Sequence, residues 1–263
     1  MIDKNEILKA VKETALRCGE IFLSAEKEDL ETQTKSGRRD LVTKFDLAVQ
    51  NYAVSALKKS FPQAKFFCEE TKDGNELSGE IVFIIDPIDG TANFVNGFHH
   101  SCISIGCLSF GEAVCGVVFD PYKNEMFFAS KGNGAFLNGR KISVAKNDLG
   151  SKMVMFGTSP YNTELRDTTL EMLKNVYSNC LDVRRSGSAA LDLCYVASSK
   201  AGLYFEGIVS LWDYAAGLII LREAGGEAYD FSMKPLGFKE GKTSIIAGST
   251  EMIEEFLNTQ KTQ

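Results

Sequence analysis

A pair of aspartates at the end of an apolar run carries the clearest chemical signal in this sequence. The run ends in Asp-Pro-Ile-Asp-Gly-Thr at positions 86–91. Because proline fixes φ and cannot donate to a sheet ladder, we expect the chain to leave the sheet at Pro87, with Asp86 and Asp89 converging. Gly90 lets backbone N–H groups approach an anion closely, and Thr91 adds a hydroxyl.

These two carboxylates allow two interpretations. Carboxylates at a buried strand end repel each other unless they are protonated or bound to a metal, and hard oxygen ligands favour Mg²⁺. The same sequence is also typical of an acidic turn that only ends a strand. The motif taken alone leaves both interpretations open.

Further carboxylates stand at comparable places in the chain. Glu69 and Glu70 follow a short apolar run at 65–67, whereas Asp46 and Asp213 stand at the starts of predicted helices. Each has a structural explanation when considered alone, as a solvated acidic loop or as a helix cap. Their combination with the pair at 86 and 89 favours a shared metal site.

The elements around these residues indicate helices layered on sheets. One helix is predicted over about the first 23 residues and a second from 43–46 to about 59, with a polar loop at 33–39 between them. Antiparallel strands are predicted at 81–85, 102–108, 113–119, 125–129 and 134–137. The remainder alternates, with strands at 153–156, 203–206 and 244–247 and helices at 163–177, 188–198, 213–223 and from about 250.

Composition narrows the function classes. The 263 residues carry a formal net charge of −6 with 44% hydrophobic residues, which argues against nucleic-acid and membrane-surface binding, since both need a basic footprint. Neither a signal peptide nor a membrane span is evident, so a cytoplasmic protein is expected. The seven cysteines lie mostly in apolar segments and are predicted to be reduced core residues. The adjacent His99 and His100 lack a spaced thiolate, which disfavours zinc.

The order of the acidic motifs resembles the lithium-sensitive, Mg²⁺-dependent phosphomonoesterase superfamily that includes the inositol monophosphatases. The pattern of that family is an early Asp, then Glu-Glu, then Asp-Pro-x-Asp-Gly-Thr/Ser, then Trp-Asp followed after eleven residues by Gly-Gly. The matching positions here are Asp46, Glu69 and Glu70, 86–91, Trp212 and Asp213, and Gly225 and Gly226. Similarity extends through 40–43, 93–95, 131–136 and 185–190, so it covers nearly the whole chain.

The resemblance implies an α/β (α+β) fold, a layered αβαβα sandwich that is usually dimeric. A metal site would lie between an N-terminal half, residues 1–145, and a C-terminal half, residues 146–263, within one compact unit. It would hold two or three Mg²⁺ ions, with Li⁺ as an inhibitor. The implied ligands are Glu69, Asp86 and the Ile88 carbonyl for one ion, Asp86, Asp89 and Asp213 for a second, and Glu69 and Glu70 for a weaker third.

The same resemblance implies hydrolysis of a small phosphate monoester, foremost inositol 1-phosphate, by metal-activated water without a covalent intermediate. Glu69, Asp46 and Thr91 would act on the attacking water. The implied substrate-binding residues are Asp89, Gly90, Thr91, Ser188, Ala189, Glu206 and Asp213. Lys35 and Ser36 match a mobile metal-sensing loop of the family, although a plain basic loop explains them as well.

Three alternatives are weighed against this hypothesis. A haloacid-dehalogenase phosphatase is disfavoured because that motif has one residue between its aspartates, whereas Pro87 and Ile88 intervene here. Within the resembled superfamily, the substrate could be fructose 1,6-bisphosphate, a 3′-phosphoadenosine nucleotide, NADP⁺ or histidinol phosphate. A regulatory binding protein that keeps the fold without its chemistry, for instance one that docks on a transcription complex, is the alternative of another class.

Overall fold

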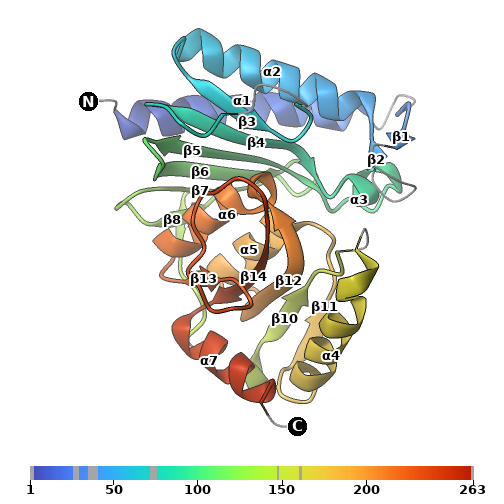
Figure 1. Cartoon of the computed structure of the whole chain (residues 1–263). Coiled ribbons are helices and arrows are strands. Elements are labelled where there is room, and N and C mark those ends of the chain that lie inside the picture. Colours follow the sequence, from blue (N-terminus) through green and yellow to red (C-terminus); the bar gives the residue numbers. More distant parts are fainter. Residues whose placement is uncertain are drawn as a thin grey trace.

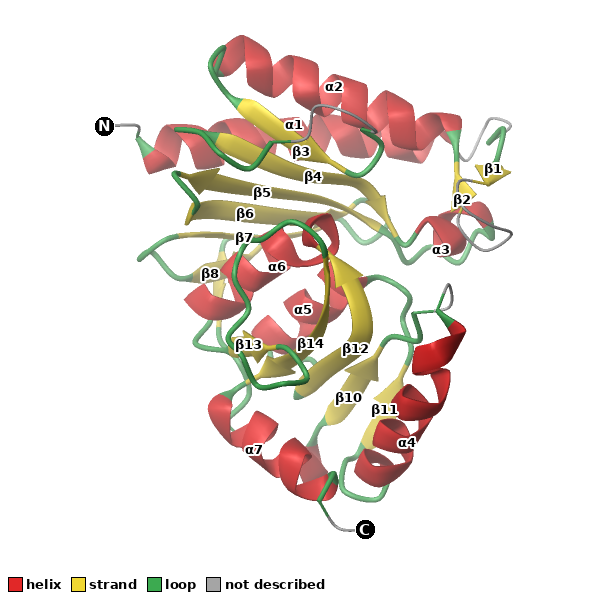
Figure 2. Ribbon diagram, viewed as in Figure 1, coloured by secondary structure: helices red, strands yellow, loops and turns green. Residues whose placement is uncertain are grey.

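Five layers of helix and sheet make up this protein. The computed structural model describes residues 3–25, 30–34, 41–71, 76–146, 148–159 and 162–261. Within these ranges a helix pair, a seven-stranded sheet, a second helix pair, a five-stranded sheet and a last pair of helices follow one another (Figure 1). Colouring by secondary structure shows the same alternation (Figure 2). The predicted αβαβα sandwich is confirmed.

Helices α1 (Lys4–Ser24) and α2 (Lys44–Ser60) form the first layer. The carboxylate of Asp3 accepts a hydrogen bond from the Asn5 N–H at 2.8 Å and so caps α1. Apolar side chains such as Phe22 and Val49 are fully buried against the first sheet. Burial of one such side chain stabilises the fold by about 1.5–3 kcal/mol. A short antiparallel pair, β1 (Gln33–Thr34) and β2 (Leu41–Val42), lies beside this layer.

The first sheet runs in chain order from β3 to β9. Only its first pair, β3 with β4, is parallel, and every other neighbouring pair is antiparallel. The strands are β3 (Lys65–Cys68), β4 (Val82–Asp89), β5 (Cys102–Ser109), β6 (Glu112–Asp120), β7 (Glu125–Ser130), β8 (Ala135–Leu137) and β9 (Arg140–Ile142). The predicted strands are present, and β3 and β9 are two additional ones.

Strand β4 does not end where the sequence predicted. It continues through Pro87 to Asp89, so the prediction that the chain leaves the sheet at Pro87 is wrong. The pairing shifts instead, because Asp86 faces Ser104 while Asp89 faces Cys102. The three residue steps from Asp86 to Asp89 on β4 are thus paired with only two steps on β5. The extra residue on β4 forms a β-bulge, which accommodates Pro87, a residue without a backbone N–H. Since side chains alternate along a strand, the extra residue lets both aspartates face the same side.

Helices α5 (Ala189–Ala197) and α6 (Leu211–Glu223) form the middle layer. Glycines in the first sheet let α6 approach closely, because a Cβ on Gly116 would lie 2.6 Å from the Ala216 carbonyl oxygen. The helix therefore packs backbone against backbone on β5 and β6. This close packing brings the first turn of α6 to the sheet that carries β4.

The second sheet covers the other side of α5 and α6. Its order is β11-β10-β12-β14-β13, with β10 parallel to both of its neighbours and the other pairs antiparallel. The strands are β10 (Met153–Phe156), β11 (Asp182–Arg184), β12 (Leu203–Ser210), β13 (Glu227–Tyr229) and β14 (Lys242–Gly248). Strand β12 is longer than predicted and carries Glu206 in its middle.

Helices α4 (Arg166–Tyr177) and α7 (Thr250–Thr259) form the outermost layer, at the bottom of Figure 1. Short helical turns precede them at η2 (Leu149–Ser151) and η3 (Thr163–Leu165), and α3 (Thr91–Val95) follows β4. Among the described residues, none of the helices has the length and apolar character needed to cross a bilayer. None of the seven cysteines forms a disulfide, and six of them are buried, as predicted.

Candidate active site

The bulge in β4 places Asp86 and Asp89 at the interface between the first sheet and the middle helices. Both are buried, with 2% and 8% of their surface exposed. Asp86 Oδ1 accepts a hydrogen bond from the Ile88 N–H at 3.1 Å, which fixes the carboxylate over the bulge. Asp89 Oδ2 instead accepts bonds from the middle layer, from the Ser188 hydroxyl at 2.5 Å and the Ala190 N–H at 2.8 Å. One aspartate is thus anchored within its own strand and the other across the layers.

Asp213 reaches the same place from the start of α6. The sequence predicted that Asp213 opens this helix, but Ser210 is the N-cap, and Asp213 is the third helical residue of a capping box. Its Oδ2 accepts a hydrogen bond from the Ser210 N–H at 2.6 Å. Such a cap stabilises a helix by about 1 kcal/mol, so the structural interpretation of Asp213 holds alongside any role in a metal site.

Asp46 has the equivalent position in α2. It is completely buried, and its Oδ2 accepts hydrogen bonds from the Thr43 N–H at 2.7 Å and the Thr43 hydroxyl at 2.6 Å. Glu69 and Glu70 follow the end of β3, where the Glu69 N–H donates to the Ile85 carbonyl and the Glu70 N–H to Gln50 Oε1. Glu69 therefore stands beside the strand that carries Asp86.

Burial and neighbouring negative charges raise the pKa values of Asp86, Asp89 and Asp213. Burial first, and then the negative charges of Glu69, Asp89 and Asp213, raise the pKa of Asp86 well above its usual value. Burial, followed by Asp89 and Glu69, raises the pKa of Asp213 in the same way. Burial raises the pKa of Asp89 to about 6, although its hydrogen bonds from Ser188 and Ala190 oppose the shift. The structure therefore brings together the four carboxylates that we call the carboxylate cluster: Glu69, Asp86, Asp89 and Asp213.

The carboxylate cluster suits a hard divalent cation by its chemistry. The charges that act most strongly on Asp86 are all acidic, and they add to the free-energy cost of burying this carboxylate. Carboxylate oxygens are the ligands that Mg²⁺ prefers, and a bound cation reverses the local repulsion. Within the described ranges, however, no three acidic, histidine or cysteine side chains are already gathered as a metal cage. Separate hydrogen bonds hold the aspartates, so binding would require the carboxylates to close in on the ion.

Gly90 and Thr91 form the turn after Asp89. Gly90 has φ 88°, and a Cβ there would lie 3.1 Å from the carbonyl oxygens of Gly187 and His100. Only glycine meets both requirements without strain. The Thr91 hydroxyl donates to the Ile88 carbonyl at 3.1 Å, so two residues predicted for the site contact each other directly. Helix α3 is a single short turn, and its dipole therefore adds little to anion binding at this position.

Asn93 joins this turn to the second half of the chain. Its Nδ2 donates to the His100 carbonyl at 2.7 Å and to the Ser186 carbonyl at 2.9 Å. Ser188, two residues beyond Ser186, is the N-cap of α5, and Ala189 begins that helix. Asn93 and Asp89 thus fasten the segment predicted to contact substrate to the segment predicted to hold phosphate.

Glu206 lies on β12 near the carboxylate cluster, and its charge contributes to the raised pKa values of Asp89 and Asp213. Burial raises the pKa of Glu206, while hydrogen bonds from Tyr204 and Ser159 lower it. The strand predicted at 203–206 is longer than expected, because β12 continues to Ser210 and Glu206 lies within it.

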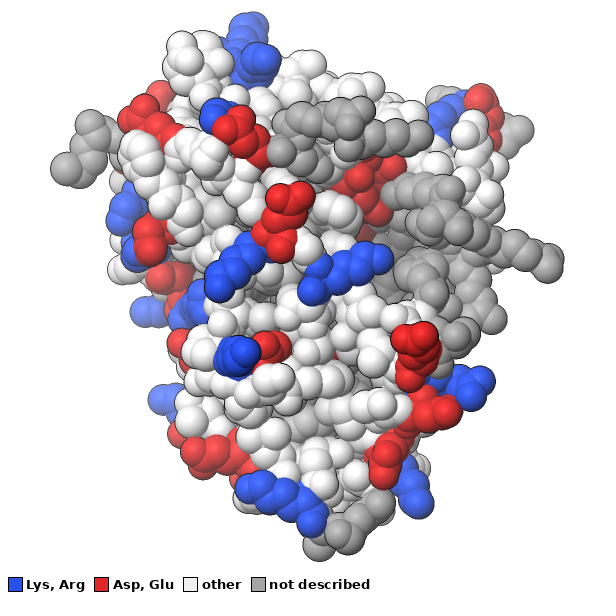
Figure 3. All heavy atoms as spheres, viewed as in Figure 1, with Lys and Arg blue, Asp and Glu red and all other residues white. Residues whose placement is uncertain are grey.

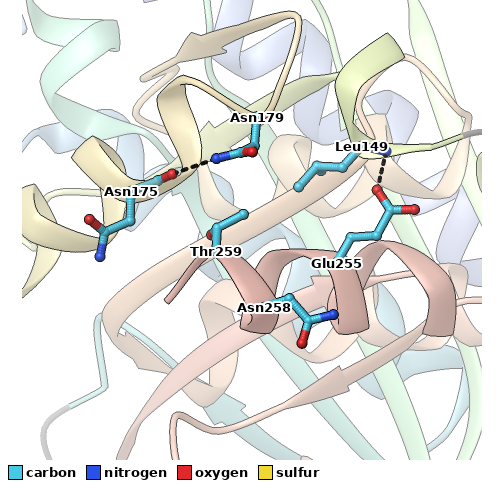
Figure 4. A pocket seen from close by; sticks show the side chains of 6 residues that line it. All are labelled: Leu149, Asn175, Asn179, Glu255, Asn258 and Thr259. Atoms are coloured by element: carbon cyan, nitrogen blue, oxygen red, sulfur yellow. Dashed lines mark hydrogen bonds between the residues drawn. The ribbon is translucent and has the colours of Figure 1, made fainter. Parts of the chain in front are cut away.

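One other surface and one cavity can be compared with the carboxylate cluster for side chains that could take part in a reaction. The face drawn in Figure 3 scatters acidic and basic side chains among other residues. A cavity of about 460 Å³ lies between α4 and α7 (Figure 4). Its lining has one ionisable residue, Glu255, which accepts a hydrogen bond from the Leu149 N–H at 2.7 Å. Neither the surface in Figure 3 nor the cavity in Figure 4 is therefore as good a candidate for the active site as the carboxylate cluster. The predicted loop at Lys35 and Ser36 lies outside the described residues.

Sequence reasoning missed several residues of the site. Ser159 and Tyr204 hold Glu206, and Asp192 is buried in α5 with its pKa raised first by burial. Ser159 is 47 positions from Glu206, so no spacing rule connects them. Tyr204 stands two residues before Glu206 on one strand, and that spacing, which puts both on one face, could have suggested the pair.

Comparisons with known proteins agree with this arrangement. Residues 3–263 match the model of the Inositol monophosphatase family. Two similar relatives are Nus factor SuhB from Pasteurella multocida, 36% identical over 97% of this chain and 95% of that protein, and Inositol monophosphatase 2 from Saccharomyces cerevisiae, 40% identical over 73% and 70%. The structure of the extragenic suppressor protein suhB from Bartonella henselae superposes with a TM-score of 0.89 at 30% identity, covering 97% of this chain and 98% of that one. This chain belongs to the inositol monophosphatase family, a family of phosphatases.

Proposed function

We propose that this protein is a Mg²⁺-dependent phosphatase that hydrolyses small phosphate monoesters, with inositol 1-phosphate as the first candidate substrate. The observation that carries the proposal is the carboxylate cluster, in which Glu69 after the end of β3, Asp89 on β4 and Asp213 on α6 all raise the pKa of the buried Asp86. Family membership and the yeast relative named Inositol monophosphatase 2 support the reaction class.

The proposed ligands are Glu69, Glu70, Asp86, the Ile88 carbonyl, Asp89 and Asp213. When bound, Mg²⁺ ions would neutralise the phosphate dianion, lower the pKa of a water and stabilise the leaving oxygen. Glu69, with Thr91 and Asp46, would orient the attacking water and take up its proton. Asp46 and Thr91 already use polar atoms in local hydrogen bonds, so each would serve both the fold and the site.

The backbone turn and the second half of the chain would bind the substrate. The N–H groups of Gly90 and Thr91 would hold phosphate oxygens, because the turn exposes backbone where a Cβ has no room. Ser188 and Ala189, at the start of α5, and Glu206, on β12, would contact hydroxyls of the substrate. Asp213 would lie near the scissile oxygen.

Phosphate release from purified protein tests this proposal. Inositol 1-phosphate, fructose 1,6-bisphosphate, a 3′-phosphoadenosine nucleotide, NADP⁺ and histidinol phosphate would be compared with Mg²⁺ and with excess chelator. The proposal predicts turnover that depends on Mg²⁺, that is highest for inositol 1-phosphate and that Li⁺ inhibits by occupying a metal position. Turnover that is unchanged by chelator would rule it out. Light scattering would test the homodimer that the family resemblance implies.

A binding role is the second candidate, because the relative from Pasteurella multocida is named Nus factor SuhB. The Asp89→Asn variant separates the two candidates. A catalytic role requires the charge of Asp89, whereas binding to a protein partner would survive its replacement by a neutral side chain of the same shape.

A further inference from the structure

The carboxylate of Glu206 is held by two residues that no motif identified. The Tyr204 hydroxyl donates to Oε2 at 2.6 Å, and the Ser159 N–H donates to Oε1 at 3.0 Å. The Ser159 hydroxyl lies 3.2 Å from both Oε1 and the Ile208 carbonyl. Since that hydroxyl has one hydrogen, the negative charge favours its donation to Glu206. Both oxygens of Glu206 are therefore oriented by the protein itself.

The environment of Glu206 also limits where its carboxylate can lie. A Cβ on Gly157 would be only 1.9 Å from the carboxylate carbon of Glu206, so Glu206 occupies the space that any larger residue would fill. Ser159 adopts a left-handed backbone conformation, with φ 41°, that is unfavourable for a residue with a side chain. The Ile208 N–H donates to the Ser159 hydroxyl at 2.9 Å and ties this strained residue to β12.

These bonds leave Glu206 a limited capacity to accept more. A carboxylate offers about four acceptor positions, two on each oxygen. Ser159 occupies those of Oε1 with its N–H and its hydroxyl, and Tyr204 occupies one on Oε2. About one position on Oε2 is left, which suits a single hydroxyl and not a pair. The charge of Glu206 acts on Asp89 and Asp213, so Glu206 lies near the carboxylate cluster, where the proposed function places the substrate.

We propose that Tyr204 and Ser159 are positioning residues that hold Glu206 so that it accepts one hydroxyl of the substrate. The site then selects phosphate monoesters that carry a hydroxyl near the phosphate over monoesters that carry none. This inference rests on the proposed phosphatase function and adds to it two residues that set specificity. Neither residue touches the substrate, so both act through Glu206.

The test compares a hydroxylated substrate with an unhydroxylated one. The hydroxylated substrate is inositol 1-phosphate or glycerophosphate, whichever the wild type hydrolyses faster, and the other is para-nitrophenyl phosphate. We expect Tyr204→Phe and Ser159→Ala to lower the ratio of the two kcat/KM values about tenfold each, because a freed Glu206 binds the hydroxyl less well. The loss should appear in KM for the hydroxylated substrate, with para-nitrophenyl phosphate unaffected.

Two controls separate positioning from a general structural effect. Tyr214→Phe also removes one hydrogen bond of a buried tyrosine, at 3.0 Å to the Gly237 carbonyl, and should leave the ratio unchanged. In a Glu206→Gln background, Tyr204→Phe should have little further effect on the ratio, because both changes act on the same contact.

The outcomes distinguish this inference from the proposed function. An equal loss for both substrates in Tyr204→Phe and Ser159→Ala, or a further loss of the ratio in the Glu206→Gln background, would overturn the positioning role. Hydrolysis of para-nitrophenyl phosphate alone by the wild type would also overturn it while leaving a metal-dependent phosphatase in place. Absence of Mg²⁺-dependent hydrolysis of every substrate would overturn the proposed function itself.

Discussion

The carboxylate cluster and the carboxylate group of Glu206 lie close together in this protein but are stabilised differently. In the carboxylate cluster, Asp86 and Asp213 face further negative charge, which together with burial raises the pKa of both well above its usual value. Glu206 is half-buried, and neutral donors on Tyr204 and Ser159 bind both of its oxygens. The first arrangement costs free energy until a cation binds, whereas the second is complete without one.

This difference in stabilisation indicates different roles for the carboxylate cluster and for Glu206. A site with uncompensated charge gives a divalent cation a large gain in free energy on binding, at the expense of the stability of the metal-free protein. A carboxylate with hydrogen bonds to both oxygens instead keeps a fixed orientation, which recognition of a substrate hydroxyl at the remaining acceptor position requires. We therefore assign chemistry to the first group and selection to the second.

The largest expected effect separates the two groups by activity. Asp89→Asn should lower kcat about a thousandfold for hydroxylated and unhydroxylated substrates alike, because it removes charge from the proposed metal site. Glu206→Gln should cost about tenfold, and only for the hydroxylated substrate. Steady-state kinetics with both substrates would check this contrast. Asp182→Asn, at an exposed ion pair with Arg184, is the matched control and should retain activity. Similar losses in Asp89→Asn and Glu206→Gln would erase the distinction.

Stability as a function of pH sharpens the same comparison. The folded pKa of Asp89 is about 6, above its ordinary value of 3.8, so the folded state binds more protons between these values. In chelator, the free energy of unfolding should therefore fall as pH rises from about 4 to about 6, by on the order of 3 kcal/mol. Denaturant unfolding measured across this range would show the slope.

Two comparisons attribute that slope to the carboxylate cluster. The Asp89→Asn variant should have a shallower slope than the wild type and keep the part due to Asp86 and Asp213, whose pKa values are also raised. Mg²⁺ should raise the stability of the wild type at the upper end of the range. Asp182→Asn should keep the wild-type slope, because the Asp182 side chain is partly exposed and pairs with Arg184. A slope of the opposite sign would contradict the account of a repulsive cluster.

The smallest expected effect is on stability and concerns the turn at Gly90, directly after Asp89 of the carboxylate cluster. Gly90 and Gly97 both have positive φ, but a Cβ on Gly90 would meet backbone oxygens at 3.1 Å, whereas one on Gly97 would meet nothing within 4 Å. Gly97→Ala should cost about 1 kcal/mol from backbone strain alone, and Gly90→Ala should cost about 1–2 kcal/mol more. Chemical denaturation would measure both. Equal costs would show that the contact of Gly90 with the Gly187 and His100 carbonyls is unimportant.

Much of the fold could be predicted because local patterns and the tertiary structure agree. The helices over 4–24 and 44–60 follow from apolar periodicity and from capping residues such as Thr43. Strand β4 was the exception. Pro87 is ordinarily a strand terminator, and only the pairing with β5 shows that the bulge absorbs it. The consequence predicted for Asp86 and Asp89, that they come together, nevertheless holds, because, beyond the effect of burial, the charge of Asp89 raises the pKa of Asp86.

The candidate site was predictable where its residues form motifs and unpredictable where they meet through the fold. Asp86 and Asp89 stand in one short motif, and the family resemblance supplied Asp213. The contact of Ser159 with Glu206 depends instead on β10 lying parallel to β12, which no local pattern specifies. Short strands such as β9 and β13 escaped prediction for the same reason, because neighbouring strands stabilise them more than their own sequence does.

Calorimetric titration with Mg²⁺ tests most directly whether the carboxylate cluster binds a cation. The wild type should show saturable binding, and Asp213→Asn should bind at least about tenfold more weakly, because it loses one charged ligand. Equal affinity in both proteins, or no binding by a wild type that still hydrolyses phosphate monoesters in chelator, would contradict the shared metal site.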